Sequence, residues 1–276
     1  DNNTVLSNYI SSTELECISP DIHTAGAVSV EVTVNGVDVS SDGVMFEYVN
    51  DAVVTAIHPA SGPATGGTAV SLIGYDFVDN DSLSCYFGEE AVLGRWISPT
   101  EVECISPAVA SNASVTFGMS LNGVDYTASS SIFVYYDDCV VSAIYPASGP
   151  FAGGTAVTVT GSNFELVPDL VCRFGLIDVA AVYVSSAEVV CHSPPSVVGE
   201  ESTVSVSKNG VDFLESSSMF VYEEMPSVRS VHPSQGSVSG GTVLVVSGSG
   251  FKDRDSLQCL FGGNALILAN YISSTE

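Results

Sequence analysis

The chain has 276 residues, of which 6 are Lys or Arg and 32 are Asp or Glu, so its formal net charge is −26. So acidic a chain repels the phosphates of nucleic acids and anionic membrane surfaces, which argues against both as partners. No apolar run reaches the length of about 18 residues that a membrane span needs, so no membrane insertion is expected.

A run rich in proline, glycine and serine organises the chain and occurs three times, around Pro59, Pro146 and Pro233. Successive copies are 87 residues apart, whereas the repeats of solenoids and propellers run at about 20 to 50 residues. A period of 87 is that of a domain with its own core. Four segments are expected: the back half of a domain at 1–50, complete domains at 51–138 and 139–225, and the front half of a domain at 226–276.

Within a domain, apolar residues alternate with polar ones and predict short strands. A turn rich in glycine and proline is expected at 145–154, and Asn122-Gly123 is expected to form the type I′ turn of a hairpin. No segment of helical length shows a 3.6-residue period. About seven strands per domain predict an immunoglobulin-like sandwich. In the second complete domain the first five strands are expected at 140–144, 155–161, 170–174, 179–184 and 188–191.

The links between domains are short. Only four residues separate Tyr48 from Val53, and four separate Tyr135 from Val140. Tethers of this length restrict bending, so the domains are expected to form a rod-like array.

Six of the seven cysteines follow the period of 87. The repeated separation of 19 residues predicts one disulfide per domain between neighbouring strands, and an oxidising compartment outside the cytosol. Buried free thiols are the alternative. The predicted pairs are Cys85 with Cys104 and Cys172 with Cys191, and the half pairs are Cys17 and Cys259.

Several short motifs recur in the same order in both complete domains: Pro-x-Ser-Gly-Pro, Gly-Gly-Thr, Gly-x-x-Phe, Cys-x-Phe-Gly, Cys-x-Ser-Pro, Asn-Gly and Phe-x-Tyr. This series resembles the IPT/TIG family of immunoglobulin-like domains, which occurs in plexins, scatter-factor receptors, fibrocystin-type proteins and some transcription factors. The resemblance covers essentially the whole chain. It implies an all-β sandwich fold and binding or structural work, with no catalytic residues to carry over.

The two ends resemble each other, because residues 8–14 recur as residues 270–276. Half a sandwich of about 50 residues cannot bury a sufficient core or pair its edge strands. Residue 1 is therefore not expected to be the start of translation, and each end is expected to be completed by further copies of the domain. The copies belong either to one polyprotein or to subunits joined by strand complementation.

Acidic loops are candidates for weak calcium sites, because carboxylates are the hard ligands that calcium prefers. The candidates are Asp79 with Asp81 and Asp253 with Asp255, and further acids lie beside the domain junctions. We favour solvated acidic loops, because no twelve-residue calcium loop is present. No cofactor is expected.

N-glycosylation is expected at the Asn-x-Ser/Thr triplets of Asn2, Asn80 and Asn112. Cys139 has no counterpart in the other domains, and either cross-links to another chain or is buried and inert.

The sequence predicts no enzyme. None of its four histidines has a positioned partner, and no nucleophile or phosphate-binding motif is present. We expect an extracellular structural protein whose domains assemble head to tail into a filament or surface appendage. A receptor or adhesin ectodomain that binds a protein or glycan is the alternative.

Overall fold

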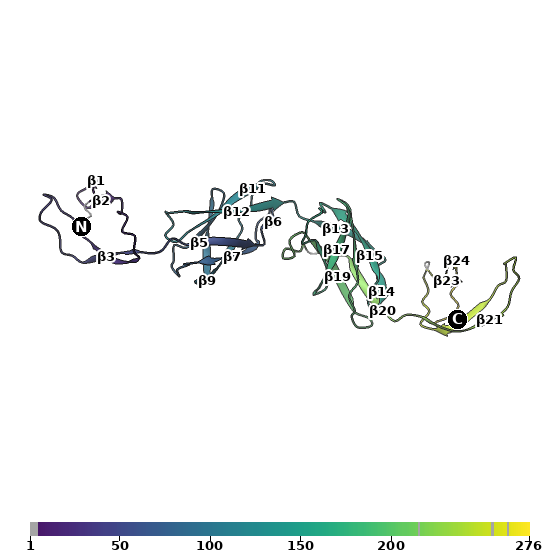
Figure 1. The fold of residues 1–276 in the computed structure, drawn as a ribbon. Helices are drawn as coiled ribbons and strands as arrows, with labels where there is room; N and C mark the ends of the chain where they lie inside the picture. Colours follow the sequence, from purple (N-terminus) through teal and green to yellow (C-terminus); the bar gives the residue numbers. More distant parts are fainter. Residues whose placement is uncertain (1–4, 215, 255–256, 264) are drawn as a thin grey trace. The chain divides into compact units, whose positions relative to one another are not determined.

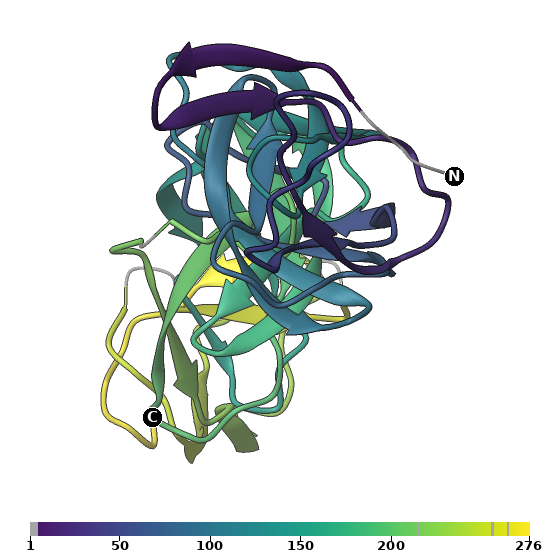
Figure 2. The ribbon, with the colours of Figure 1, turned by 90° about the vertical axis from the view of Figure 1, so that its left-hand side faces the viewer.

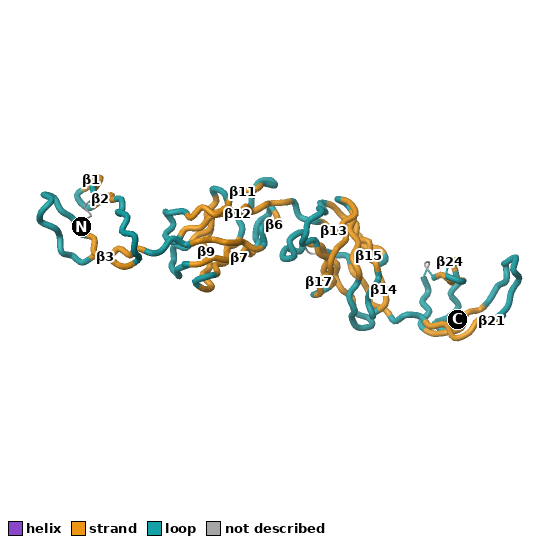
Figure 3. The backbone as a smooth tube through the Cα atoms, in the orientation of Figure 1, coloured by secondary structure: helices purple, strands orange, loops and turns teal. Residues whose placement is uncertain are grey.

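The computed structural model describes residues 5–214, 216–254, 257–263 and 265–276. This described part is built from strands and loops and contains no helix, which confirms the all-β prediction (Figure 1, Figure 3). Accordingly, no helix in it has the length and apolar character that crossing a membrane requires.

The chain divides into two compact units. The first comprises residues 1–58, 69–105 and 116–132, and the second comprises 59–68, 106–115 and 133–276. The expected domain 51–138 thus contributes to both units, whereas 139–225 lies wholly in the second. The ribbon is shown from a second direction in Figure 2.

The first unit holds most of the N-terminal strands in the described part of the chain. These are β1 (Ser7–Ser11), β2 (Glu14–Cys17), β3 (Gly26–Val30), β4 (Val44–Tyr48), β5 (Val53–His58), β7 (Ala69–Tyr75), β8 (Ser84–Phe87), β9 (Glu90–Ser98) and β10 (Glu101–Ile105). Strands β11 (Ser114–Ser120) and β12 (Thr127–Tyr136) run through both units.

The second unit holds the strands of the other complete repeat and of the C-terminal segment. These are β6 (Ser61–Pro63), β13 (Val140–Tyr145), β14 (Ser148–Pro150), β15 (Ala156–Ser162), β16 (Val171–Phe174), β17 (Ile177–Ser185), β18 (Glu188–His192), β19 (Glu201–Ser207), β20 (Met219–Glu223), β21 (Ser227–His232), β22 (Val245–Ser249), β23 (Gln258–Phe261) and β24 (Ala265–Leu268).

The eight strands of the repeat in the second unit are hydrogen-bonded in the order β13-β15-β18-β17-β16-β19-β20-β14, and β5 to β12 have the equivalent order. Strand β17 pairs with β16 through residues 177–180 and with β18 through residues 181–185. It thereby belongs to both layers of the sandwich. Inward-facing side chains such as Val157, Phe174 and Phe220 fill the core.

Both predicted disulfides form, Cys85–Cys104 and Cys172–Cys191. The expectation that each joins neighbouring strands is wrong. Cys172 lies on β16 and Cys191 on β18, and these strands flank β17 rather than pair with each other. The bridge therefore clamps the point where β17 passes from one layer to the other.

Two predicted turns differ from the structure. Within the turn expected at 145–154, Ser148–Pro150 forms the short strand β14, which pairs in parallel with β20. This is possible because an edge strand pairs on one side only, so its proline needs no amide there. Asn122-Gly123 does not form a type I′ turn, because Gly123 has a φ of 75° while Asn122 is not in the positive-φ region.

The two end segments form only two-stranded sheets. These sheets are β1-β2, β3-β4, β21-β22 and β23-β24. Most of their side chains are exposed, including Tyr9, Met45 and Leu266. Such hairpins bury little apolar surface and are marginally stable by themselves.

Candidate interdomain interface

A hairpin loop with the sequence Asn-Gly-Val-Asp follows the same strand in the first three segments, at 35–38, 122–125 and 209–212. In the loop at 209–212, the Asn209 Oδ1 accepts hydrogen bonds from the backbone N–H groups of Val211 and Asp212, at 3.1 and 2.9 Å. The Asn209 Nδ2 donates to the Asp212 carboxylate at 2.7 Å. The same bonds form within the loops that start at Asn35 and Asn122. The loop is thus shaped by its own side chains before it contacts anything else.

In the second unit this loop docks on the preceding repeat. The Asn209 Nδ2 also donates to the backbone carbonyl of Ser61 at 2.8 Å, and the Thr68 hydroxyl donates to the Asp212 carboxylate at 2.7 Å. Thr68 is fully buried and Asn209 is 3% exposed. Burying two polar residues is costly unless each has a hydrogen-bond partner. Here Asn209 bonds to the preceding repeat through Ser61, and Thr68 bonds to the following repeat through Asp212.

The docking face explains two of the recurring motifs. Ser61 comes from the Ser-Gly-Pro motif and Thr68 from the Gly-Gly-Thr motif, and Gly62 brings them together. A Cβ at Gly62 would clash with the Thr68 hydroxyl, so glycine allows the two segments to meet. The Ser106 hydroxyl accepts a bond from the Thr68 backbone N–H at 3.1 Å, which holds Thr68 in position.

Lys208, beside the loop, is the most deeply buried cation at this interface. Its side chain is 1% exposed, and its Nζ lies 2.8 Å from the Glu165 carboxylate and 4.2 Å from the centre of the Tyr136 ring. A buried ammonium group is costly unless a carboxylate and an aromatic face replace its lost hydration. Lys208 therefore fits only where Tyr136 of one repeat and Glu165 of the next lie together.

Tyr136 and Cys139 are also buried at this interface. Burial raises the pKa of Tyr136, and the nearby negative charge of Asp212 adds to this effect. Burial likewise raises the pKa of the Cys139 thiol to about 11, against a smaller opposing effect of Lys208. A thiol with so high a pKa is protonated and unreactive at neutral pH. Of the two predictions for Cys139, the structure favours the buried, inert side chain.

The IPT/TIG domain model matches residues 1–48, 52–136, 139–222 and 226–276. The chain belongs to the IPT/TIG domain family. Its four matched segments, called IPT/TIG repeats from here on, follow one another almost without gaps.

The relatives of the chain are much longer proteins. Fibrocystin-L of Mus musculus is 28% identical over 277 residues, which cover 97% of this chain and 6% of that protein. Fibrocystin-L of Homo sapiens is 26% identical over 222 residues, which cover 79% of this chain and 5% of that protein. Among solved structures, the full extracellular region of Plexin A4 is 21% identical, with a TM-score of 0.44 over 82% of this chain and 20% of that structure.

The three predicted calcium ligands that the structure describes do not form a cluster. Asp79, Asp81 and Asp253 are exposed, and Asp255 lies outside the described residues. Within the described ranges, no three His, Cys, Asp or Glu side chains are grouped so that they could hold a metal ion. The described acidic residues therefore provide no preformed site, and calcium binding stays a prediction.

Two of the three predicted glycosylation sites are described, and both are exposed. The Asn80 Oδ1 accepts a bond from the Ser82 backbone N–H, and the Asn112 Nδ2 donates to the Asp137 carboxylate at 2.9 Å. Asn2 lies outside the described residues. The half-pair cysteines Cys17, on β2, and Cys259, on β23, are free.

Sequence reasoning missed the whole interdomain interface. Asn209 and Asp212 were visible only as part of a turn motif, and the turn explained them without any partner. The available signal was Lys208, since the equivalent residues are Val34 and Leu121. A lone lysine at an otherwise apolar repeat position is evidence of a site-specific partner.

Proposed function

We propose that this chain is a segment of an extracellular, non-enzymatic structural protein in which IPT/TIG repeats join head to tail. The observation that carries the proposal is the docked hairpin loop, with Asn209 and Asp212 bonded to Ser61 and Thr68. The docking residues come from motifs that recur in the repeats. The same interface can therefore join further repeats, either along one polypeptide or between subunits of a filament.

The extracellular location is supported by the two disulfides and the exposed sequons. The non-enzymatic role is supported by the IPT/TIG match, because the family provides no catalytic residues that could be carried over to this chain. A continuous array is supported by the relatives, since this chain spans about one-twentieth of their length. That comparison favours a long polypeptide over subunits joined end to end.

The proposal is tested on native material by two measurements. Negative-stain microscopy is expected to show long uniform fibres if the repeats assemble into a filament, and separate short rods if they form the ectodomain of a receptor or adhesin. The mass of the denatured, reduced native chain distinguishes the two kinds of array. A mass far above 28.6 kDa supports one long polypeptide, and a mass near 28.6 kDa plus glycans supports end-to-end subunits. Globular particles without any extended array would contradict the proposal.

A further inference from the structure

The side chains that meet at a junction change together from one junction to the next. Three positions meet at the junction of the second unit, namely Tyr136 at the end of the last strand, Glu165 in the loop after Gly-x-x-Phe, and Lys208 before the hairpin loop. One period earlier, in the first unit, the equivalent residues are Val49, Val78 and Leu121. All three positions have thus changed together from apolar to polar or aromatic.

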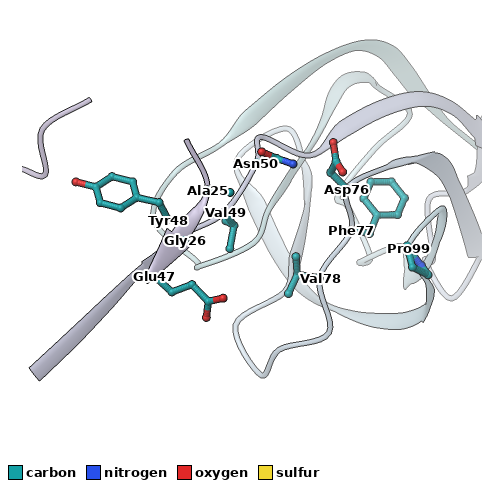
Figure 4. Close-up of a pocket in the computed structure, with 10 residues that line it drawn as sticks. All are labelled: Ala25, Gly26, Glu47, Tyr48, Val49, Asn50, Asp76, Phe77, Val78 and Pro99. Atoms are coloured by element: carbon teal, nitrogen blue, oxygen red, sulfur yellow. The ribbon is translucent and has the colours of Figure 1, made fainter. Parts of the chain in front are cut away.

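The apolar set lines shallow hollows in the first unit. Val49 and Val78 lie on the wall of one hollow, with Phe77 and Pro99 beside them (Figure 4). Val49 also lines a second hollow together with Leu121. Val49 and Val78 are 44% and 38% exposed, so the apolar side chains of this junction keep partial contact with water, whereas the Lys208 side chain of the second unit is 1% exposed.

One period later, the charge is reversed. The residue equivalent to Tyr136 is Glu223, and the residue equivalent to Glu165 is Lys252. The Lys252 Nζ lies 2.9 Å from the Glu223 carboxylate, which also pairs with Arg254. The loop after Gly-x-x-Phe therefore carries an acid at one junction and a base at the next, each opposite a suitable neighbour.

We infer that these matched sets make each IPT/TIG repeat fit its own predecessor better than it fits another repeat of the same chain. The partner of each junction surface is an IPT/TIG repeat with the complementary set. If the repeat with Val78 and Leu121 followed the surface of Glu223, this carboxylate, whose side chain is only 15% exposed, would lose Lys252 and Arg254 as partners, and its unpaired charge would disfavour the wrong order. Three of the six cations of the chain, Lys208, Lys252 and Arg254, are used in this way.

The inference rests on the docking described under the proposed function, and Cys139 offers a readout for both. This thiol is 7% exposed and lies at the junction of the second unit. Its alkylation rate in the full chain, measured by mass spectrometry of the tryptic peptides, reports opening of the junction. Exposed Cys17 serves as the internal reference.

Glu165→Val leaves Lys208 buried without its carboxylate and is expected to raise the Cys139 alkylation rate about tenfold or more. Adding Lys208→Leu installs the apolar pair of the first unit against Tyr136, which does not match it, and is expected to leave the rate at least about fivefold above that of the unmodified chain. Adding Tyr136→Val as well completes the apolar set and is expected to return the rate to within about twofold of the unmodified chain. Asp169→Val, which removes an exposed acid elsewhere in the same repeat, is the matched control and leaves the rate unchanged.

If the double variant already returns to the rate of the unmodified chain, or if the triple variant with Tyr136→Val is alkylated as fast as Glu165→Val, the matched-set inference is overturned while docking stands. If Cys139 reacts as fast as Cys17 in the unmodified chain, docking itself is absent and both proposals fail.

Should Glu165→Val unfold the repeat, seen as loss of the β-sheet circular dichroism signal, the other charged junction provides the test. There Glu223→Lys is expected to speed deuterium uptake at residues 223–229, and Lys252→Glu with Arg254→Glu to reverse it. Failure of that reversal overturns the inference.

Discussion

The hairpin loops at 122–125 and 209–212 have the same four residues and the same internal hydrogen bonds, yet Asn122 and Asp125 are exposed, whereas Asn209 is buried and Asp212 is half-buried. In the first unit, Asn122 and Asp125 bond within their own loop. In the second, Asn209 and Asp212 also bond to Ser61 and Thr68. The comparison shows that the motif forms a finished loop first, and that docking adds contacts without reshaping it.

The largest expected effect concerns the disulfide that each of the two complete repeats contains. Replacing both Cys172 and Cys191 by Ser is expected to lower the free energy of unfolding of that repeat by about 3 kcal/mol, because the bridge constrains the unfolded chain. The matched pair Cys85 and Cys104 is expected to give a similar loss in its own repeat. Denaturant unfolding followed by hydrogen exchange measures both, and Trp96 fluorescence reports the first of the two repeats.

Unequal losses of unfolding free energy on removal of the two disulfides would contradict the assumption that the two complete repeats have equivalent cores. They would mean that the cores differ as well as the junctions, so that the difference between the two loops could not be assigned to docking.

The next largest effect is a difference in stability between variants of the two hairpin loops. Asp212→Ala removes the acceptor of both Asn209 and Thr68 and is expected to cost about 1 to 2 kcal/mol, because it leaves the buried Thr68 hydroxyl without its acceptor. Asp125→Ala removes an exposed bond and is expected to cost about 0.5 kcal/mol or less. Thermal unfolding of the two variants measures this difference, and equal losses would count against docking.

A smaller effect concerns pH at the junction of Glu223. Partial burial alone would raise the pKa of Glu223, but the hydrogen bonds and charges of Lys252 and Arg254 outweigh it, so the pKa lies below its ordinary value of 4.5. A lowered carboxylate pKa means that the junction gains stability above the ordinary value and loses it as the pH falls through the folded-state value.

Deuterium uptake at residues 223–229 should therefore be constant from neutral pH down to about pH 5, after correction for the intrinsic rate, and should increase below the ordinary value of 4.5. Glu223→Gln is expected to remove this dependence. A transition above that value would contradict the assigned ion pairs.

The smallest expected effect is that of calcium. Because Asp79, Asp81 and Asp253 are exposed and unclustered, removing calcium with a chelator is expected to shift the melting temperature by less than about 1 °C. Differential scanning calorimetry measures this shift. A clear fall in the melting temperature would show that calcium stabilises the acidic loops.

The sequence predicted the parts of the fold that local patterns determine. The alternation of Val157 and Val159 with polar residues located β15, and the repeated cysteine separation located both bridges. The short strand β14 was missed because a run of Ser-Gly-Pro has the composition of a turn, and only its pairing with β20 makes it a strand.

The interface could not be predicted in the same way, because no local pattern specifies a contact between two domains. Asn209 and Asp212 are satisfied within their loop, so nothing in the sequence required a partner. The available signal was Lys208, at a position where other repeats have Val34 and Leu121, and the structure identified its partners as Tyr136 and Glu165.

The docking of the hairpin loop is tested most directly by deuterium uptake at the backbone amides of Val124 and Asp125 and of Val211 and Asp212 in the same full chain. The two pairs of amides make equivalent bonds to Asn122 and Asn209, so only docking distinguishes them. Docking predicts that the amides of Val211 and Asp212 exchange at least about tenfold more slowly. Equal rates in the two loops would contradict it.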